Sequence, residues 1–325
     1  MRLGAHMSIA GGVHRAFARG ESVGCTALQI FVKNANRWVG KPISAEDIAQ
    51  FSAERKRSGI EAVIAHNSYL INLATQDEML WRRSIDALQD ELERCEALGL
   101  EALVIHPGAH MGSGLEVGIA RVAQGLDATM ARLPGARCRI LLESTAGMGT
   151  TLGSRFEQLH AIHERVRQPE RIGMCLDTAH VFVAGYDIRT AQGVRDTLDQ
   201  FDAICGGENL RAIHLNDSRA PFASARDRHA HIGQGEIGLA AFAALLSDPR
   251  LQNVPMVLET PKGEDLREDL RNLETLRALA AGKTPAARPP LRTPEWKKGM
   301  LPSPKRTAAR LTRNRNAKKR ARASR

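Results

Sequence analysis

Six short apolar segments of the sequence end in a side chain that can bind a metal ion. These side chains are His66 after AVIA, His106 after ALVI, Glu143 after RILL, Asp177 after MCL, His214 after RAI and Glu259 after PMVL. Any one of them alone is more often structural, either a buried histidine that only hydrogen-bonds or an acid that caps a helix. Six together indicate bound cations, because crowded, unpaired carboxylates and imidazoles are costly to remove from water.

Two further groups extend this set to nine. His180 follows Asp177 by three residues, and we interpret Asp177 in MCLDTAH as a metal ligand rather than as a helix cap. Asp227 and His229 are two residues apart, so their side chains point the same way if the loop is extended. A catalytic zinc usually takes three protein ligands, and nine ligands therefore predict a cluster of two or three ions.

The donor types indicate which ions and which chemistry to expect. Five histidines and four carboxylates favour Zn²⁺, with Mn²⁺ as the alternative, over the all-oxygen sites of Mg²⁺. Clustered divalent ions activate a water molecule and stabilise phosphate charge, which points to hydrolysis of a phosphoester. A sugar isomerase or epimerase on a similar barrel is the enzymatic alternative, and it would need one or two ions held mostly by carboxylates.

The elements that position these residues are predicted from hydrophobic patterns. Eight segments read as strands buried on both faces, at 3–8, 27–32, 62–66, 102–108, 139–144, 174–180, 211–217 and 255–260. Helical patterns separate most of them, with predicted starts at Ser44, Thr75 and Ser154. The alternation predicts an α/β fold, a (β/α)₈ TIM barrel over 1–282, whose strand ends converge on one face. An open doubly wound sheet is the structural alternative, but the first predicted strand is not followed by G-x-G-x-x-G.

The charge of the chain is divided unevenly. The net charge is +10, yet residues 283–325 hold 15 Lys+Arg and one acid, which leaves 31 basic and 35 acidic residues in 1–282. This Lys/Arg/Pro-rich tail lacks apolar clusters and is predicted to be disordered. We expect it to bind nucleic acid non-specifically through phosphate contacts. The alternative for the tail is a solubilising extension. The alternative for the whole protein is a DNA-binding protein that acts through this tail and carries an inactive, relict barrel.

Cysteine usage and hydropathy bear on the compartment. Five cysteines are scattered singly without a C-x-x-C pair, as in reduced intracellular proteins. The sequence shows no signal peptide and no apolar run long enough to span a bilayer. We therefore expect a cytoplasmic protein with no membrane partner.

Several motifs carry a family resemblance from the first predicted strand to about residue 281. They are GAHMS, HNSYLINL, HPGAH, LESTAG, LDTAHVFVAGYD, HLNDS, DRHAHIGQGEIG and LETP, and their order is that of endonuclease IV. The chain thus resembles the trinuclear-zinc apurinic/apyrimidinic endonucleases. The resemblance implies base excision repair, in which the phosphodiester 5′ to an abasic site in double-stranded DNA is hydrolysed and a 3′-hydroxyl remains.

The same resemblance implies roles for the ligands. One zinc would take His66, His106 and Glu143; a second would share Glu143 and add Asp177, His214 and Glu259; a third would take His180, Asp227 and His229. Glu143, as the bridge, and Glu259, as an aid to proton transfer, are the expected catalytic residues.

Loops of the family also contact DNA and extrude the abasic nucleotide. The matching positions are Asn34, Asn36, Arg37, Tyr69, Leu70 and Arg228. Asn36 stands where the family commonly has arginine, with Arg37 next to it, and Gln234 replaces the usual glutamate of IGEG. Which side chain of the first loop enters the DNA is therefore open. We expect a monomer that associates with the nucleoid.

Overall fold

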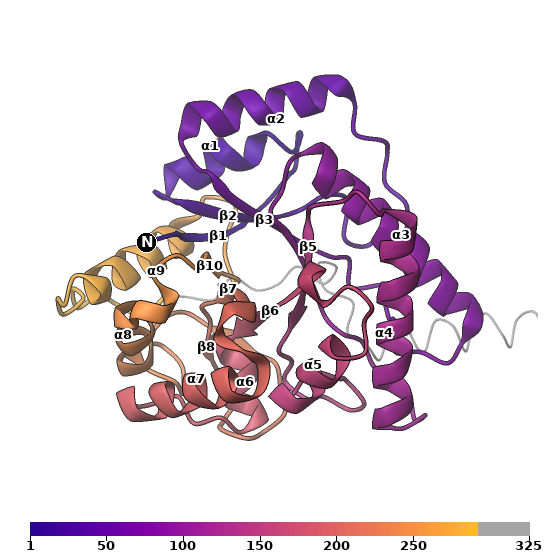
Figure 1. The fold of residues 1–325 in the computed structure, drawn as a ribbon. Coiled ribbons are helices and arrows are strands. Elements are labelled where there is room, and N and C mark those ends of the chain that lie inside the picture. The colour runs from indigo at the N-terminus through magenta and orange to yellow at the C-terminus, as the bar shows by residue number, and fades with distance from the viewer. Residues whose placement is uncertain (292–325) are drawn as a thin grey trace, which may run out of the picture. The chain divides into compact units, whose positions relative to one another are not determined.

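Eight parallel strands close into a barrel within residues 1–291, the part of the chain that the computed structural model describes. Figure 1 shows the strands at the centre and the helices around them. The strands are β1 (Leu3–Met7), β2 (Ala27–Phe31), β3 (Ala62–His66), β4 (Ala102–Ile105), β5 (Arg139–Glu143), β6 (Ile172–Asp177), β7 (Leu210–His214) and β10 (Met256–Leu258). Each predicted apolar segment contains most or all of one of these strands, although residues 178–180 belong to the helix that follows β6. The predicted TIM barrel is confirmed, and its closure through β1 and β10 excludes an open sheet.

Side chains inside the barrel form a small core of their own. This inner cluster consists of Ala27, Ala62, Ile64, Ala102, Val104, Leu141, Cys175, Ala212 and Val257. Side chains alternate along a strand, so a residue two positions further on also points inward. His66 follows Ile64, and Glu143 follows Leu141, by two positions. The predicted ligands His66 and Glu143 therefore point into the barrel, next to the inner cluster.

The other face of the strands packs against an outer ring of helices. The ring contains α1 (Arg15–Ser22), α2 (Ala45–Ser58), α3 (Glu78–Ala97), α4 (Leu115–Arg132), α5 (Phe156–His163), α7 (Ala191–Cys205), α8 (Leu239–Ser247) and α9 (Arg267–Ala280). Two shorter features follow β6 and β7: the seven-residue helix α6 (Thr178–Ala184) and the hairpin of β8 (Asp217–Ser218) with β9 (His229–Ala230). None of the helices within 1–291 combines the length and apolar character needed to cross a membrane.

The predicted helix starts agree with the structure in one case out of three. Ser44 caps α2 in a capping box with Asp47, as predicted. The start at Thr75 is wrong, because Asp77 caps α3 and accepts hydrogen bonds from the amides of Met79 and Leu80, both at 3.1 Å. The start at Ser154 is also wrong, since α5 begins at Phe156 and Arg155 makes no side-chain cap.

The last helix, α9, ends at Ala280, close to the boundary predicted at residue 282. Residues 292–325 lie outside the described residues, and so does the predicted disorder of most of the basic tail. The division of the chain at residue 282 stays a prediction.

Candidate metal centre

The nine predicted ligands gather at the carboxyl ends of the barrel strands. His66, Glu143, Asp177 and His214 are the last residues of β3, β5, β6 and β7, His106 and Glu259 directly follow β4 and β10, His180 lies in α6, and Asp227 and His229 lie in the β8–β9 hairpin. Donor atoms from eight of them form three groups, within each of which the atoms lie no more than 4.8 Å apart. Asp227, the ninth, lies beside the third group.

Glu143 lies at the centre and is fully buried. Its Oε2 atom lies 3.0 Å from Nε2 of His66 and 3.0 Å from Nε2 of His106. Its Oε1 atom lies 3.0 Å from Nδ1 of His214 and 3.3 Å from Nδ1 of His180. One carboxylate therefore faces two separate groups of imidazoles, as a bridging ligand would.

The second group joins Glu143 to Asp177, His214 and Glu259. Nδ1 of His214 lies 3.3 Å from Oε2 of Glu259 and 3.7 Å from Oδ2 of Asp177. The side chain of Glu259 is 15% exposed, whereas Glu143 and Asp177 are fully buried. Glu259 is consequently the carboxylate of this group that a substrate can reach.

The third group contains Asp177, His180 and His229, with Asp227 beside it. Oδ2 of Asp227 lies 3.4 Å from Nε2 of His180, and its Oδ1 lies 3.2 Å from Nε2 of His229. Asp177 reaches this group too, because its Oδ2 lies 3.6 Å from Nε2 of His229. Asp177 therefore connects the second and third groups.

Hydrogen bonds orient four of the histidines for metal binding. His66 Nδ1 donates to the carbonyl of Asn67, His180 Nδ1 to that of Ser144, and His229 Nδ1 to that of Glu259, at 2.9, 2.8 and 3.2 Å. His214 Nε2 donates to Oε1 of Gln29 at 2.8 Å. In each ring the other nitrogen faces the carboxylates and could offer its lone pair to a metal ion, the arrangement that metal-binding histidines adopt.

The spacing of the donor atoms also fits metal ions. Two ligands at roughly 2.0 to 2.1 Å from a tetrahedral zinc lie about 3.3 Å apart, and the pairs formed by the free ring nitrogens lie 3.0 to 3.7 Å apart. Nε2 of His229 is buried and makes no hydrogen bond within residues 1–291. A cation between that nitrogen and Asp227 would satisfy both.

The carboxylates of the site need positive charge close by to balance their own. Burial works against ionisation of Glu143, but the imidazoles of His106 and His214 hold its pKa well below the usual range. Burial likewise opposes a charge on His229, yet Asp227 and Asp177 raise its pKa to about 9. The carboxylates thus attract protons onto the neighbouring rings, and divalent cations would supply this charge in their place.

Two residues that the sequence did not single out hold the ligands in place. Gln29 in β2 donates from Nε2 to Oε1 of Glu259 at 2.6 Å, in addition to accepting from His214. Asn216 donates to Oδ2 of Asp177 at 2.7 Å and accepts from the amide of Glu259 at 2.8 Å. A polar residue inside an apolar strand (Gln29) and a polar residue two positions after a ligand (Asn216) were the available signals.

The interpretation of Asp177 as a ligand rather than as a helix cap needs a correction. Asp177 is the N-cap of α6, and its Oδ1 accepts a hydrogen bond from the amide of His180 at 3.0 Å. Its Oδ2 meanwhile faces the second and third groups. The two oxygens of one carboxylate allow both roles, so cap and ligand are not alternatives here.

The predicted DNA-contact residues lie in loops beside the mouth and are accessible. Asn34, Asn36, Arg37, Tyr69 and Arg228 are exposed, and Leu70 is half-buried. Tyr69 is 43% exposed, and its ring centroid lies 5.7 Å from that of His66 and 6.4 Å from that of His106. Tyr69 is therefore a surface residue directly over the ligands.

A buried ion pair between Lys33 and Glu91 of α3 helps to connect the loop after β2 with the loop after β3, which carries Tyr69. Lys33 Nζ lies 3.1 Å from Oε1 of Glu91, with side chains only 2% and 1% exposed. Glu91 accepts from the amide of Ser68, and Lys33 donates to the carbonyl of Trp38 at 2.9 Å. The hydroxyl of Ser68 in turn donates to the carbonyl of Ala35 at 2.6 Å. This ion pair and these hydrogen bonds hold the loops after β2 and β3 together.

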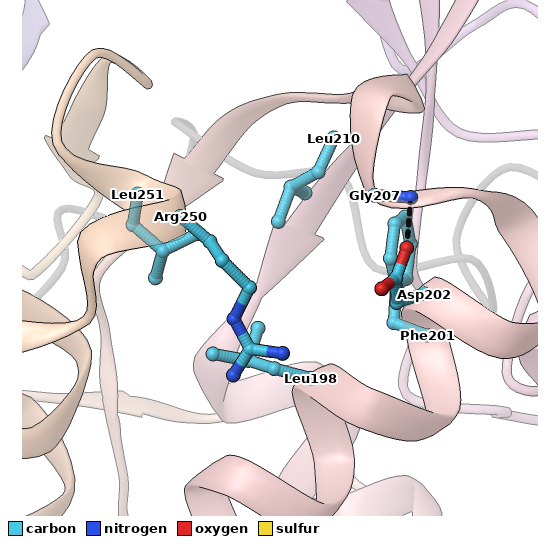
Figure 2. Close-up of a pocket in the computed structure, with 7 residues that line it drawn as sticks. All are labelled: Leu198, Phe201, Asp202, Gly207, Leu210, Arg250 and Leu251. Carbon is cyan, nitrogen blue, oxygen red and sulfur yellow. Dashed lines mark hydrogen bonds between the residues drawn. The ribbon is translucent and has the colours of Figure 1, made fainter.

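A small pocket elsewhere on the barrel is not part of this centre. Figure 2 shows it between Leu198, Arg250 and Leu210. Leu210 is the first residue of β7, at the opposite end of the strand from His214. The pocket therefore opens at the amino ends of the strands, away from the ligands.

The comparisons with known proteins agree with this geometry. Residues 17–276 match the family described as xylose isomerase-like TIM barrel. Probable endonuclease 4 of Chloroflexus aurantiacus is 52% identical over 281 residues, 86% of this chain and 99% of that protein. Probable endonuclease 4 of Geobacter sulfurreducens is 46% identical over 87% of this chain and 95% of that protein.

Solved structures separate the family from its wider fold. Endonuclease IV from Thermus thermophilus superposes with a TM-score of 0.77 at 37% identity, over 87% of this chain and 100% of that one. A D-tagatose 3-epimerase-like protein has a TM-score of 0.66 at 18% identity, over 86% of this chain and 97% of that one, which shows a shared fold alone. The chain belongs to the endonuclease IV family and is a nuclease built on a TIM barrel.

Proposed function

We propose that this protein hydrolyses the phosphodiester 5′ to abasic sites in double-stranded DNA and leaves a 3′-hydroxyl, as a step of base excision repair. The observation that carries the proposal is the set of three adjoining donor groups that share Glu143 and Asp177 at the barrel mouth. Three groups correspond to three ions, and the imidazole content favours Zn²⁺, with Mn²⁺ as the alternative at one site.

The residues divide among the ions by proximity. His66, His106 and Glu143 would hold the first, and Glu143, Asp177, His214 and Glu259 would hold the second. His180, His229 and Asp227 would hold the third, with Asp177 alongside. Such ions, when bound, lower the pKa of a coordinated water and stabilise the charge on a phosphoryl group and its leaving oxygen.

Glu259 is suited to handle a proton during hydrolysis. Gln29 holds its Oε1, while its side chain remains partly exposed at the mouth. The imidazole of His6 lies 3.5 Å from the same oxygen. A fixed, accessible carboxylate can accept a proton from an attacking water and orient it toward phosphorus. Glu143 is fully buried and cannot reach the substrate, so its role would be to bind the ions and to balance their charge.

Metal content and incision together test this function. Purified protein is expected to bind about three zinc ions and to cut an abasic duplex, and a chelator should abolish cutting until zinc is restored. His180→Ala and Glu259→Gln should each lose activity while circular dichroism shows the barrel intact. Protein with three ions that leaves an abasic duplex uncut would falsify the proposal. One or two ions and activity on a sugar would indicate the epimerase chemistry of its fold neighbours.

Tyr69 is expected to enter the duplex at the gap left by the extruded abasic nucleotide and to stack on a neighbouring base. Stacking of a base on an aromatic ring contributes roughly 1 to 3 kcal/mol, so Tyr69→Ala should lower kcat/KM on an abasic duplex by about 10- to 100-fold. Tyr69→Phe keeps the ring and serves as the matched control, with activity near that of the parent chain. Equal losses in both variants would assign the effect to the hydroxyl and contradict a stacking role.

The remaining contacts and the cellular setting follow from the same function. Asn34, Asn36, Arg37, Leu70 and Arg228 contact the duplex around the lesion, and the basic tail adds non-specific phosphate contacts. We place the protein in the cytoplasm at the nucleoid, acting as a monomer.

A further inference from the structure

The β8–β9 hairpin contains a buried carboxylate that is not one of the nine ligands. This carboxylate belongs to Asp217 in β8, which is fully buried and follows the ligand His214 by three residues. Five backbone amides donate to its two oxygens at 2.8 to 3.4 Å, those of Ser218, Gly233, Gly235, Ile237 and Gly238. Asp217 therefore holds together two parts of the chain that lie about fifteen to twenty residues apart.

Most of these amides come from one glycine-rich turn. Residues 233–238, here named the glycine turn, have the sequence GQGEIG and fit the pattern G-x-G-x-x-G. In phosphate-binding loops such glycines let backbone amides surround a phosphate. Here the amides point at Asp217, while Gly233 and Gln234 are exposed on the other side. The glycine turn thus binds an anion of its own chain in place of a phosphate.

The contact between the glycine turn and β8 is close. A Cβ atom at Gly235 would lie 2.3 Å from the carbonyl oxygen of Ser218 and 2.4 Å from Oδ1 of Asp217. Glycine lets the backbone approach the carboxylate at this distance. The amide of Glu236 also donates to the carbonyl of Ser218, at 2.7 Å. The turn is therefore bound to β8 through the Asp217 side chain and through the backbone.

The glycine turn lies just after the strand that carries His229. β8 and β9 pair over two residues only, Asp217 with Ala230 and Ser218 with His229. A hairpin of two strands is marginally stable at best by itself, even when it is longer than this. The bonds from the glycine turn extend the pairing beyond these two positions. They consequently help to fix the place of His229.

Of the three donor groups found within residues 1–291, only the third has ligands in this hairpin. His229 lies in β9 and Asp227 two residues before it, with Nε2 and Oδ1 at 3.2 Å. The ligands of the first and second groups end or directly follow strands of the closed barrel. A disturbed hairpin should thus weaken one cation site and leave the other two in place.

We propose that Asp217 is a positioning residue for the third ion: its carboxylate holds the glycine turn on β8 and so fixes the hairpin in the geometry in which His229 and Asp227 bind the ion. This inference rests on the proposed function. Asp217 acts through the two ligands and does not itself bind the ion. Residues that orient metal ligands in this way typically change metal affinity by roughly 10- to 100-fold when they are replaced.

Asp217→Asn tests this role with little change in size. Whichever way the new amide is turned, its NH2 group faces at least two of the backbone N–H groups that now donate to a carboxylate oxygen. Affinity for the third zinc should fall by at least about tenfold, measured by competition with a chromophoric chelator. Three ions held with the parental affinity would overturn the proposal.

The matched control for this substitution is Asp248→Asn. Asp248 also accepts a backbone amide, that of Arg250 at 2.9 Å, but it does so in the 3₁₀ turn Pro249–Leu251, which precedes β10. This variant should keep all three ions. Loss of the third ion here too would show that the effect is not specific to Asp217 and would overturn the proposal.

Hydrogen exchange of the zinc-loaded, full-length chains separates cause from consequence. In Asp217→Asn the amides of residues 233–238 should exchange at least about tenfold faster, while those of β3, β4 and β5 keep the parental rate. Asp227→Asn removes a ligand and leaves Asp217 in place, so it should lose the third ion yet keep the glycine turn protected. Equal exchange of the turn in both variants would assign its order to the ion and overturn the proposal, as would faster exchange throughout the barrel.

Gly235→Ala provides a second variant that keeps the carboxylate. The added methyl group would push the glycine turn away from Ser218 and Asp217, so the third ion should again be lost. Gly135→Ala is its control, because a Cβ atom there meets nothing within 4 Å, and it should keep three ions. Three tightly bound ions in Gly235→Ala would overturn the proposal even if Asp217→Asn does not fold. A parent chain that binds three ions without cutting an abasic duplex would overturn the proposed function alone, since the zinc affinities still decide the role of Asp217.

Discussion

Glu143→Gln is expected to reduce incision of an abasic duplex by at least about 10³-fold and to lower the number of bound ions. The carboxylate lies within 3.3 Å of four imidazole nitrogens and faces two of the three donor groups. Glutamine keeps its size but removes the charge that, under the proposed assignment, would balance two cations. Loss of several kcal/mol of metal binding and transition-state stabilisation corresponds to this factor.

Metal analysis and steady-state kinetics check this prediction in the same preparation. Glu116→Gln is the matched control, because Glu116 is an exposed residue of α4 with a side chain 74% accessible. It should retain three ions and full activity. A Glu143→Gln protein that holds three ions and cuts at the parental rate would show that Glu143 does not bridge.

Lys33→Met is expected to lower the free energy of unfolding by about 3 to 5 kcal/mol at neutral pH. The substitution leaves Glu91 buried without its counter-ion, and breaking a buried pair in this way costs about that amount. Because Glu91 also accepts the amide of Ser68, the loops after β2 and β3 should separate more easily. Affinity for abasic DNA should therefore fall together with stability, as measured by urea unfolding and by equilibrium binding.

The loss should depend on pH in a defined direction. Burial raises the pKa of Glu91 above its usual 4.5, although Lys33 opposes the shift. Without Lys33 the folded-state pKa rises further, so ionisation of Glu91 penalises only the folded state. The difference from the parent chain should be largest above this raised pKa, should shrink as pH falls through it, and should vanish below about 4.5, where Glu91 is protonated in the folded and in the unfolded chain.

A second substitution separates charge from packing. Lys33→Met with Glu91→Gln removes the unpaired charge while an amide oxygen still accepts from Ser68. This double variant should regain more than half of the lost stability and show little pH dependence. If it is as unstable as Lys33→Met alone, the buried charge is not the cause.

The strands and the strand-end ligands were predictable from sequence for a single physical reason. A parallel strand covered on both faces reads as an uninterrupted apolar run, so RILLE and AVIAH show both the strand and the point where it reaches the mouth. Alternation then places the last side chain inward, as found for His66 and Glu143. Neither step depends on contacts between distant parts of the chain.

Features that depend on distant contacts were not predictable in this way. Gln29 is polar inside an apolar strand, but its partners Glu259 and His214 lie 230 and 185 residues away. The pair of Lys33 with Glu91 likewise joins a loop to a helix 58 residues later. The start of α3 was predicted wrongly because two residues near it can cap a helix. Asp77, in an extended conformation, accepts from the free amides of α3 in place of Thr75.

The double use of Asp177 has a consequence for local unfolding. α6 has seven residues, too few to be stable as an isolated helix, and its first turn carries His180. Asp177 holds that turn through the amide of His180 while its second oxygen faces the cation sites. Any opening that exposes this amide to hydrogen exchange must therefore also disturb the carboxylate, and under the proposed assignment it displaces a metal ligand. Release of the ion and fraying of α6 become one cooperative event, and a filled site protects the helix from solvent.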